Sequence, residues 1–112
     1  MRSGLVTGVH AQVDLKLINR PVQAMVAIRV RPPSRTVIHS FHAFITALPE
    51  TLSVFVMSGN DNFLVHVAVR DNEQLNDFIL DRLAQRKEIT DVRTSIIFRH
   101  DQSPVVLPLR EQ

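Results

Sequence analysis

The order in which apolar residues change their spacing is the strongest constraint on how this chain can fold. Four segments place apolar side chains at every second position, as strands do, and they cover residues 22–31, 52–58, 63–70 and 92–99. Two segments place them three or four residues apart, as amphipathic helices do, and they cover residues 34–48 and 72–86. The predicted order is therefore strand, helix, strand, strand, helix, strand.

Capping and turn residues stand at the ends of the predicted helices and strands and support the predicted limits. Ser34 can cap the first helix, and Pro49 ends it. Asp71 is placed as the N-cap of the second helix, and Gln74 can complete a capping box there. The cluster Gly59-Asn60-Asp61-Asn62 joins the middle two strands as a hairpin.

Two strand–helix–strand units joined by a hairpin predict an α+β fold. Its form is a ferredoxin-like βαββαβ sandwich, with an antiparallel sheet and two helices on one face. The 112 residues suffice for one such domain with a core of its own. Because the chain contains no cysteine, disulfides, thiolate metal sites and cysteine nucleophiles are excluded.

Charge and hydropathy argue against two classes of protein, those that bind DNA through a strongly basic surface and those with a membrane-spanning helix. The 13 basic and 11 acidic residues give a net charge of +2, and the basic residues are scattered along the chain. Strong electrostatic binding of DNA by this chain alone is therefore not expected. The longest apolar run, residues 24–28, is far shorter than the ~20 residues of a membrane helix. With no secretory segment in the first 30 residues, we expect a cytoplasmic protein without membrane contact.

The sheet face turned away from the helices is predicted to be apolar, although a two-layer fold normally leaves it polar. The strand alternation places seven side chains of a predicted dimer interface there: Met25, Ala27, Phe55, Met57, Leu64, His66 and Ile97. Ala68 falls on the same face. Four strands cover about 320 Å² in projection, a size typical of an interface. We expect a two-fold dimer, the alternative being that the C-terminal tail or an N-terminal strand covers the face.

The sequence offers little for catalysis or metal binding. His39 and His42 lie three residues apart on the first predicted helix, but no third ligand stands at a matching spacing. The carboxylates of residues 71–91 resemble a solvated face, not an acid–base pair. No phosphate loop, nucleophile elbow or zinc motif is found in the sequence. We therefore expect no catalytic residue, no metal and no cofactor.

The hairpin loop is the best candidate for a binding site. Gly59 allows positive φ, Asp61 can hold an ammonium group, and asparagines supply donors and acceptors. The candidate ligand-binding residues are Gly59, Asn60, Asp61, Asn62 and Phe63, with hydroxyls from Thr94 and Ser95. Such a set suits a small zwitterion such as an amino acid. From the residues alone, ordinary turn chemistry is the alternative.

The order of several segments resembles the C-terminal effector domain of the Lrp/AsnC (feast/famine) transcription regulators. The segments are MSGNDNFL at 57–64, VAVRD at 67–71, VRTSII at 92–97, GLVTGVHAQVD at 4–14 and RPVQA at 20–24. The resemblance implies a ferredoxin-like domain that pairs through its sheets into dimers, with octamers of four dimers as a further step. It also implies that an amino acid or a related small molecule binds between dimers, using the loop equivalent to residues 59–63.

Two features differ from the family pattern. The family loop reads Gly-Asp-x-Asp, whereas here the acid stands between two asparagines, at Asp61. No helix-turn-helix precedes Gly4, so DNA would be contacted only through an absent N-terminal domain. The expected division is a linker strand at 1–20, the effector domain at 21–100 and a C-terminal arm at 101–112.

We therefore expect a regulatory domain that binds an amino acid and forms homo-oligomers, and not an enzyme. Two alternatives remain at this point. Small dimeric ferredoxin-like enzymes, such as cofactor-independent oxygenases, share the predicted fold, and fold alone does not exclude them. A purely structural assembly domain with an inactive loop is the second alternative.

Overall fold

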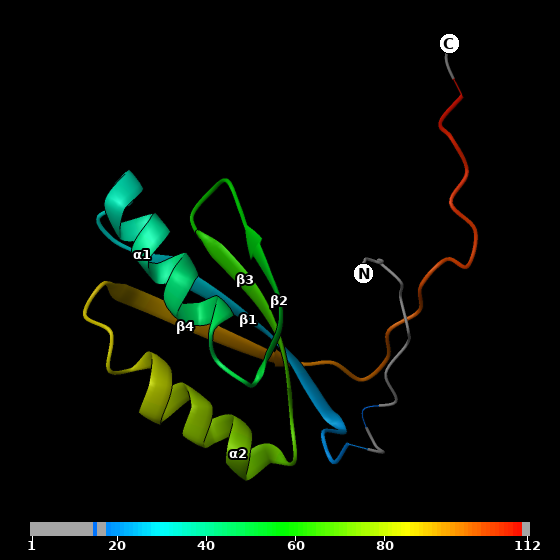
Figure 1. Cartoon of the computed structure of the whole chain (residues 1–112), viewed down its shortest axis with the longest axis horizontal. Helices are drawn as coiled ribbons and strands as arrows, with labels where there is room; N and C mark the ends of the chain where they lie inside the picture. Colours follow the sequence, from blue (N-terminus) through cyan, green and yellow to red (C-terminus); the bar gives the residue numbers. More distant parts are fainter. Residues whose placement is uncertain (1–14, 16–17, 111–112) are drawn as a thin grey trace.

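A computed structural model describes residue 15 and residues 18–110, and it confirms the predicted order of elements. The strands are β1 (Val22–Val30), β2 (Thr51–Val56), β3 (Phe63–Val69) and β4 (Ile89–Ile96). The helices are α1 (Arg35–Thr46) and α2 (Asn72–Asp77), and α2 continues as a π-helical segment, η1 (Phe78–Leu83). The four strands form one antiparallel sheet in the order β2-β3-β1-β4, with both helices on one face (Figure 1). The predicted ferredoxin-like fold is thus confirmed.

The core lies between the sheet and the helices. Alternate residues of β1 and β3 point into it and are fully buried, among them Val26, Ile28 and Val65. From α1, the ring of Phe41 packs on the ring of Phe63 with their centroids 4.8 Å apart. The predicted apolar helix stripes therefore meet the predicted inner strand face, and this burial is the main stabilising contribution to such a domain.

The strand β2 departs from the expected alternation. It lies at the edge of the sheet, and its register with β3 shifts between Thr51 and Ser53. Val54 packs against the core, but Leu52 is 40% exposed and Val56 is 59% exposed. Leu52 and Val56 are therefore not buried with Val54, because Leu52 falls in the irregular pairing and the edge strand has a neighbour on one side only.

The last strand is shifted relative to its predicted limits. β4 begins at Ile89, which pairs with Val30, and it ends at Ile96. Pairing with β1 continues to Ile97, whose N–H donates to the carbonyl of Gln23. Beyond it the described chain, residues 98–110, has no helix or strand and runs away from the sheet (Figure 1). Phe98 is 96% exposed there, so its predicted place in the strand is wrong.

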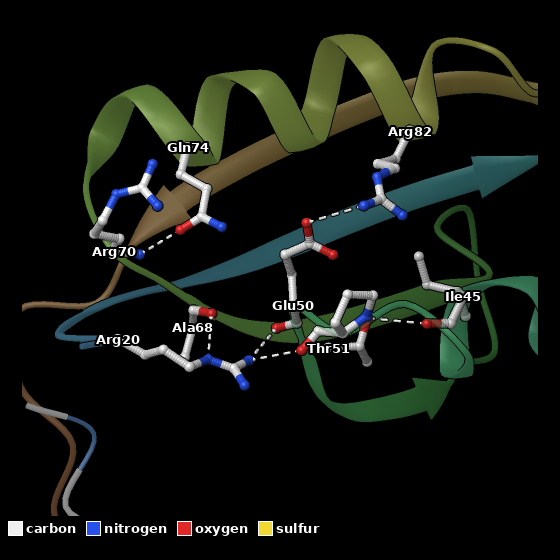
Figure 2. Close-up of polar contacts among 9 residues, drawn as sticks. Arg20, Ile45, Glu50, Thr51, Ala68, Arg70, Gln74 and Arg82 are labelled. Carbon is white, nitrogen blue, oxygen red and sulfur yellow. Dashed lines mark hydrogen bonds and ion pairs between the residues drawn. The ribbon is translucent and has the colours of Figure 1, made fainter. Parts of the chain in front are cut away.

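Both helix caps lie where the sequence predicts them. The Ser34 hydroxyl accepts from the Val37 N–H at 3.2 Å, and Asp71 Oδ1 accepts from the Gln74 N–H at 2.8 Å. The return bond of the second cap differs from a standard capping box. Gln74 Oε1 accepts from the N–H of Arg70, one residue before the N-cap, at 2.6 Å (Figure 2).

At the end of the sheet opposite the hairpin loop, polar contacts connect neighbouring segments of the chain (Figure 2). The Arg20 guanidinium donates to the carbonyls of Ala68, Pro49 and Glu50 at 2.9 to 3.1 Å. The Glu50 carboxylate lies 3.7 Å from Arg82 of η1. These contacts hold the start of β1 and the helical layer to the β2–β3 pair.

At the other end, Asn62 fastens the hairpin loop to β1. Its side-chain Oδ1 accepts from the N–H of Val30 at 2.7 Å and from Arg31 Nη1 at 3.0 Å. The Asn62 carbonyl accepts from the Met57 N–H at 2.8 Å, which closes the hairpin. The Asn62 side chain therefore holds the loop against the end of β1.

Some expectations fall outside the described residues. The predicted linker strand at 1–20 lies outside the described residues except for residues 15 and 18–20, which are not in a strand, and residues 111–112 of the C-terminal arm also lie outside them. Among the helices of the described residues, none is both long enough and apolar enough to cross a bilayer.

We predict that replacing Asn62 with alanine lowers the free energy of unfolding by about 1–3 kcal/mol, because the N–H of Val30 loses its partner. Urea denaturation measures the change. Asn60→Ala is the matched control, since Asn60 lies exposed in the same loop, and its effect should stay within about 0.5 kcal/mol. Equal losses in the two variants would contradict the anchoring role of Asn62.

Asp71 should contribute to stability in a pH-dependent way. The hydrogen bond from the Gln74 N–H lowers the pKa of the Asp71 carboxyl, with a further contribution from Arg70. A lowered pKa in the folded state stabilises the protein above the ordinary pKa of aspartate, and this contribution is lost as pH falls below about 4. The difference in unfolding free energy between wild type and Asp71→Ala should therefore shrink in acid. Urea denaturation at several pH values measures the difference, and Asp77→Ala, which removes an exposed carboxylate from the same helix, is the control.

Candidate functional site

A pocket of about 360 Å³ opens on the outer sheet face, beside the hairpin loop. Three neighbouring parts of the chain build it: β1, the β2–β3 hairpin and the start of β4. The lining residues are Ala27, Arg29, Met57, Ser58, Asn60, Asp61, Phe63, Leu64, Asp91 and Arg93. The predicted loop therefore forms one wall of a hollow whose other walls come from strands distant in sequence.

Strand register explains why an edge-strand arginine reaches the loop. Ala27 of β1 pairs with Leu64 on one side and with Arg93 of β4 on the other. Because Ala27 carries only a methyl group, the Arg93 side chain can cross β1 and form an ion pair with Asp61 Oδ2. A second carboxylate, Asp91, lies 3.9 Å from Arg93 Nε.

The charges of the pocket balance, but two of its polar atoms lack partners. Two arginines, Arg29 and Arg93, face two aspartates, Asp61 and Asp91. Among the described residues, neither Asp61 Oδ1 nor Arg29 Nε has a hydrogen-bond partner, although both are buried. An unpaired buried polar atom is costly and uncommon in folded proteins. The residues that carry these atoms, a carboxylate suited to an ammonium group and a guanidinium suited to a carboxylate, both line the pocket.

Gly59 shapes the loop at the mouth of the pocket. Its φ is +106°, a backbone conformation that residues other than glycine rarely adopt. A Cβ at this position would meet no atom within 4 Å, so glycine is needed for the backbone angle and not for space.

The structure separates the predicted ligand-binding residues into two groups. Asn60, Asp61 and Phe63 are among the residues that line the pocket, whereas Gly59 and Asn62 are not. Asn62 uses its side-chain oxygen on Val30 and Arg31, and the ring of Phe63 is fully buried against Phe41. Their side chains therefore serve the fold, because the turn needs an anchor and the inner strand face needs an apolar residue.

The two predicted hydroxyls do not reach the pocket. Thr94 pairs with Val26 on the helix-facing side, where it borders a separate hollow with Asn72 and Leu75. Ser95 lies on the outer face opposite Met25, but it does not line the pocket. Two consecutive strand residues point to opposite faces, so both could not have joined one site.

Arg29, Arg93 and Asp91 were not predicted as site residues. Arg29 continues the outer-face series of Met25 and Ala27, so the strand alternation contained a signal for it. The contribution of β4 depends on which residues of β1 and β4 stand opposite one another. That register follows from the assembled sheet and not from the residues of either strand.

The predicted interface residues share the outer face, but the face is mixed in polarity. Phe55 and Met57 are 49% and 45% exposed, and Met25, Ala27, Leu64 and Ile97 are partly buried. Ala68, expected on this face, is 1% exposed. His66 shares a 2.8 Å hydrogen bond with Gln23, and burial together with the nearby charge of His100 lowers the pKa of His66.

The histidine pair of the first helix does not form a metal site. His39 and His42 are both exposed on α1. Within residue 15 and residues 18–110, no group of three or more histidine, aspartate or glutamate residues is placed to hold a metal ion.

Comparison with known proteins identifies the family. The family model of the Lrp/AsnC ligand binding domain matches residues 23–104. The HTH-type transcriptional regulator AldR of Mycolicibacterium smegmatis is 32% identical over 97 residues, which are 87% of this chain and 57% of AldR. The chain also covers 54% of AldR from Mycobacterium tuberculosis, so it spans a little over half the length of these relatives.

Solved structures show the same fold. The crystal structure of MtbAldR has a TM-score of 0.73 and 25% identity, over 94% of this chain and 67% of MtbAldR. A complex of the regulator NMB0573 from Neisseria meningitidis with L-Met has a TM-score of 0.76 and 21% identity, over 96% of this chain and 66% of that one. With the matched family model, these findings show that the chain belongs to the Lrp/AsnC family and carries its ligand-binding domain.

Proposed function

We propose that this chain is the regulatory part of a transcription regulator and that it binds an α-amino acid in the outer-face pocket. The observation that carries the proposal is that Asp61 and Arg29 both line one pocket, while Asp61 Oδ1 and Arg29 Nε are buried without a partner among the described residues. A zwitterion carries the two groups that these atoms lack. The family match to a ligand-binding domain and the L-Met complex of the Neisseria relative support the choice of ligand class.

The pocket suggests how such a ligand would be held. The carboxylate would bind the Arg29 guanidinium and the backbone N–H groups of the loop, and the ammonium would bind Asp61. Ala27, Met57 and Leu64 form the apolar part of the lining, so an apolar side chain fits best. L-Methionine, L-leucine and L-alanine are therefore the first ligands to test.

We also propose that the chain forms a homodimer through its outer sheet face, with an octamer of four dimers as the larger assembly. Exposed Phe55 and Met57 lie on this face beside the pocket. A two-fold dimer would bury both copies of the patch and bring each pocket next to the partner. Ligand binding would then act directly on the assembly.

A catalytic role is not part of the proposal, because the relatives are transcriptional regulators and the pocket resembles a binding site for a zwitterion. DNA contact would belong to a separate domain, as the scattered charge of this chain suggests. Because the relatives are transcriptional regulators, which act where the DNA is, we propose a cytoplasmic location.

Isothermal titration calorimetry with the twenty amino acids tests the ligand. We expect at least one amino acid to bind with a Kd of about 10 µM to 1 mM. Asp61→Asn should weaken that binding by about 1.5–3 kcal/mol, because the ammonium loses a charged acceptor. Asp101→Asn removes an exposed carboxylate from the tail and should leave the Kd unchanged. If no amino acid gives heat, the loop is a structural turn and the assembly-domain alternative replaces the proposal.

Analytical ultracentrifugation at micromolar concentration tests the assembly. The wild type should sediment as a dimer or a larger even-numbered oligomer. Phe55→Asp should shift it to the monomer, because a carboxylate buried in the interface without a partner costs several kcal/mol. Leu80→Asp makes the same change at an apolar residue, 55% exposed, on the helical layer and should not dissociate the oligomer. A monomeric wild type would overturn the dimer.

A further inference from the structure

Arg93 forms an ion pair with the carboxylate of Asp61, the group that is proposed to bind the ligand. Asp61 is the acceptor proposed for the ammonium, and one of its two oxygens is already bound to Arg93. The inference that follows therefore rests on the proposed function. It concerns which ligands the pocket accepts, not whether the pocket binds one.

We propose that Arg93 determines the selectivity of the pocket by competing with the ligand ammonium for Asp61. An amino acid must share or displace this guanidinium before its ammonium reaches the carboxylate. A carboxylate ligand without an ammonium meets no such competition, and it gains a second cation, Arg93, beside Arg29. Arg93 thus lowers the affinity of the pocket for an amino acid relative to its affinity for the corresponding 2-oxo acid.

The geometry allows Arg93 to move. Its side chain is 63% exposed, whereas that of Asp61 is 24% exposed, so the aspartate is the more fixed partner. An ion pair this exposed is weak, because solvent screens it and a long side chain must be ordered. Asp91, 3.9 Å from Arg93 Nε, offers the displaced guanidinium another carboxylate. Ala27 leaves the path across β1 open.

The experiment compares Arg93→Gln with wild type by calorimetry, using three amino acids and their 2-oxo acids. The pairs are L-alanine with pyruvate, L-leucine with 4-methyl-2-oxopentanoate, and L-methionine with 4-methylthio-2-oxobutanoate. Arg99→Gln is the matched control, because it removes the same charge from an 82% exposed tail residue that is paired with Asp101.

We expect the ratio of amino-acid affinity to 2-oxo-acid affinity to rise about three- to tenfold in Arg93→Gln, because the ammonium gains its acceptor while the carboxylate loses a cation. The ratio should not change in Arg99→Gln. If an amino acid binds but the ratio of amino-acid affinity to 2-oxo-acid affinity is the same in wild type and Arg93→Gln, the selectivity role of Arg93 is overturned and the proposed function stands. If none of the six compounds binds either protein, both proposals fall for these ligands.

Discussion

β1 is paired with β3 on one side and with β4 on the other along almost its whole length, and the remaining structure depends on this double pairing. One face of β1 supplies Ala24, Val26 and Ile28 to the core. The opposite face supplies Ala27 and Arg29 to the pocket. Because strand side chains alternate, the register that buries the core also aligns the outer-face residues of three strands.

The pocket combines balanced charge with incomplete pairing. Asp61 and Arg93 neutralise one another in part, yet Asp61 Oδ1 and Arg29 Nε have no partner among the described residues. A zwitterionic ligand could satisfy both atoms without adding net charge. The competing arginine would reduce the affinity of the proposed site for an amino acid, because the ammonium must share Asp61 with Arg93.

In the proposed dimer, the position of the pocket would link ligand binding to assembly. It opens on the outer sheet face, next to the exposed side chains of Phe55 and Met57. In the proposed dimer, the ligand would lie at the edge of the interface, and the loop that holds it is fixed to β1 through Asn62. A change in this loop would reach the interface through short, direct contacts, so a long-range path through the core is not needed.

The sequence by itself determined the order of elements, the helix caps at Ser34 and Asp71, and the hairpin between the middle two strands. These are local properties, set by spacing, capping and turn residues within a few positions. Only the tertiary structure decided that Asn62 and Phe63 serve the fold, and that Arg29 and Arg93 complete the pocket. The reason is that strand register and edge position arise from pairing between distant segments, which no single segment encodes.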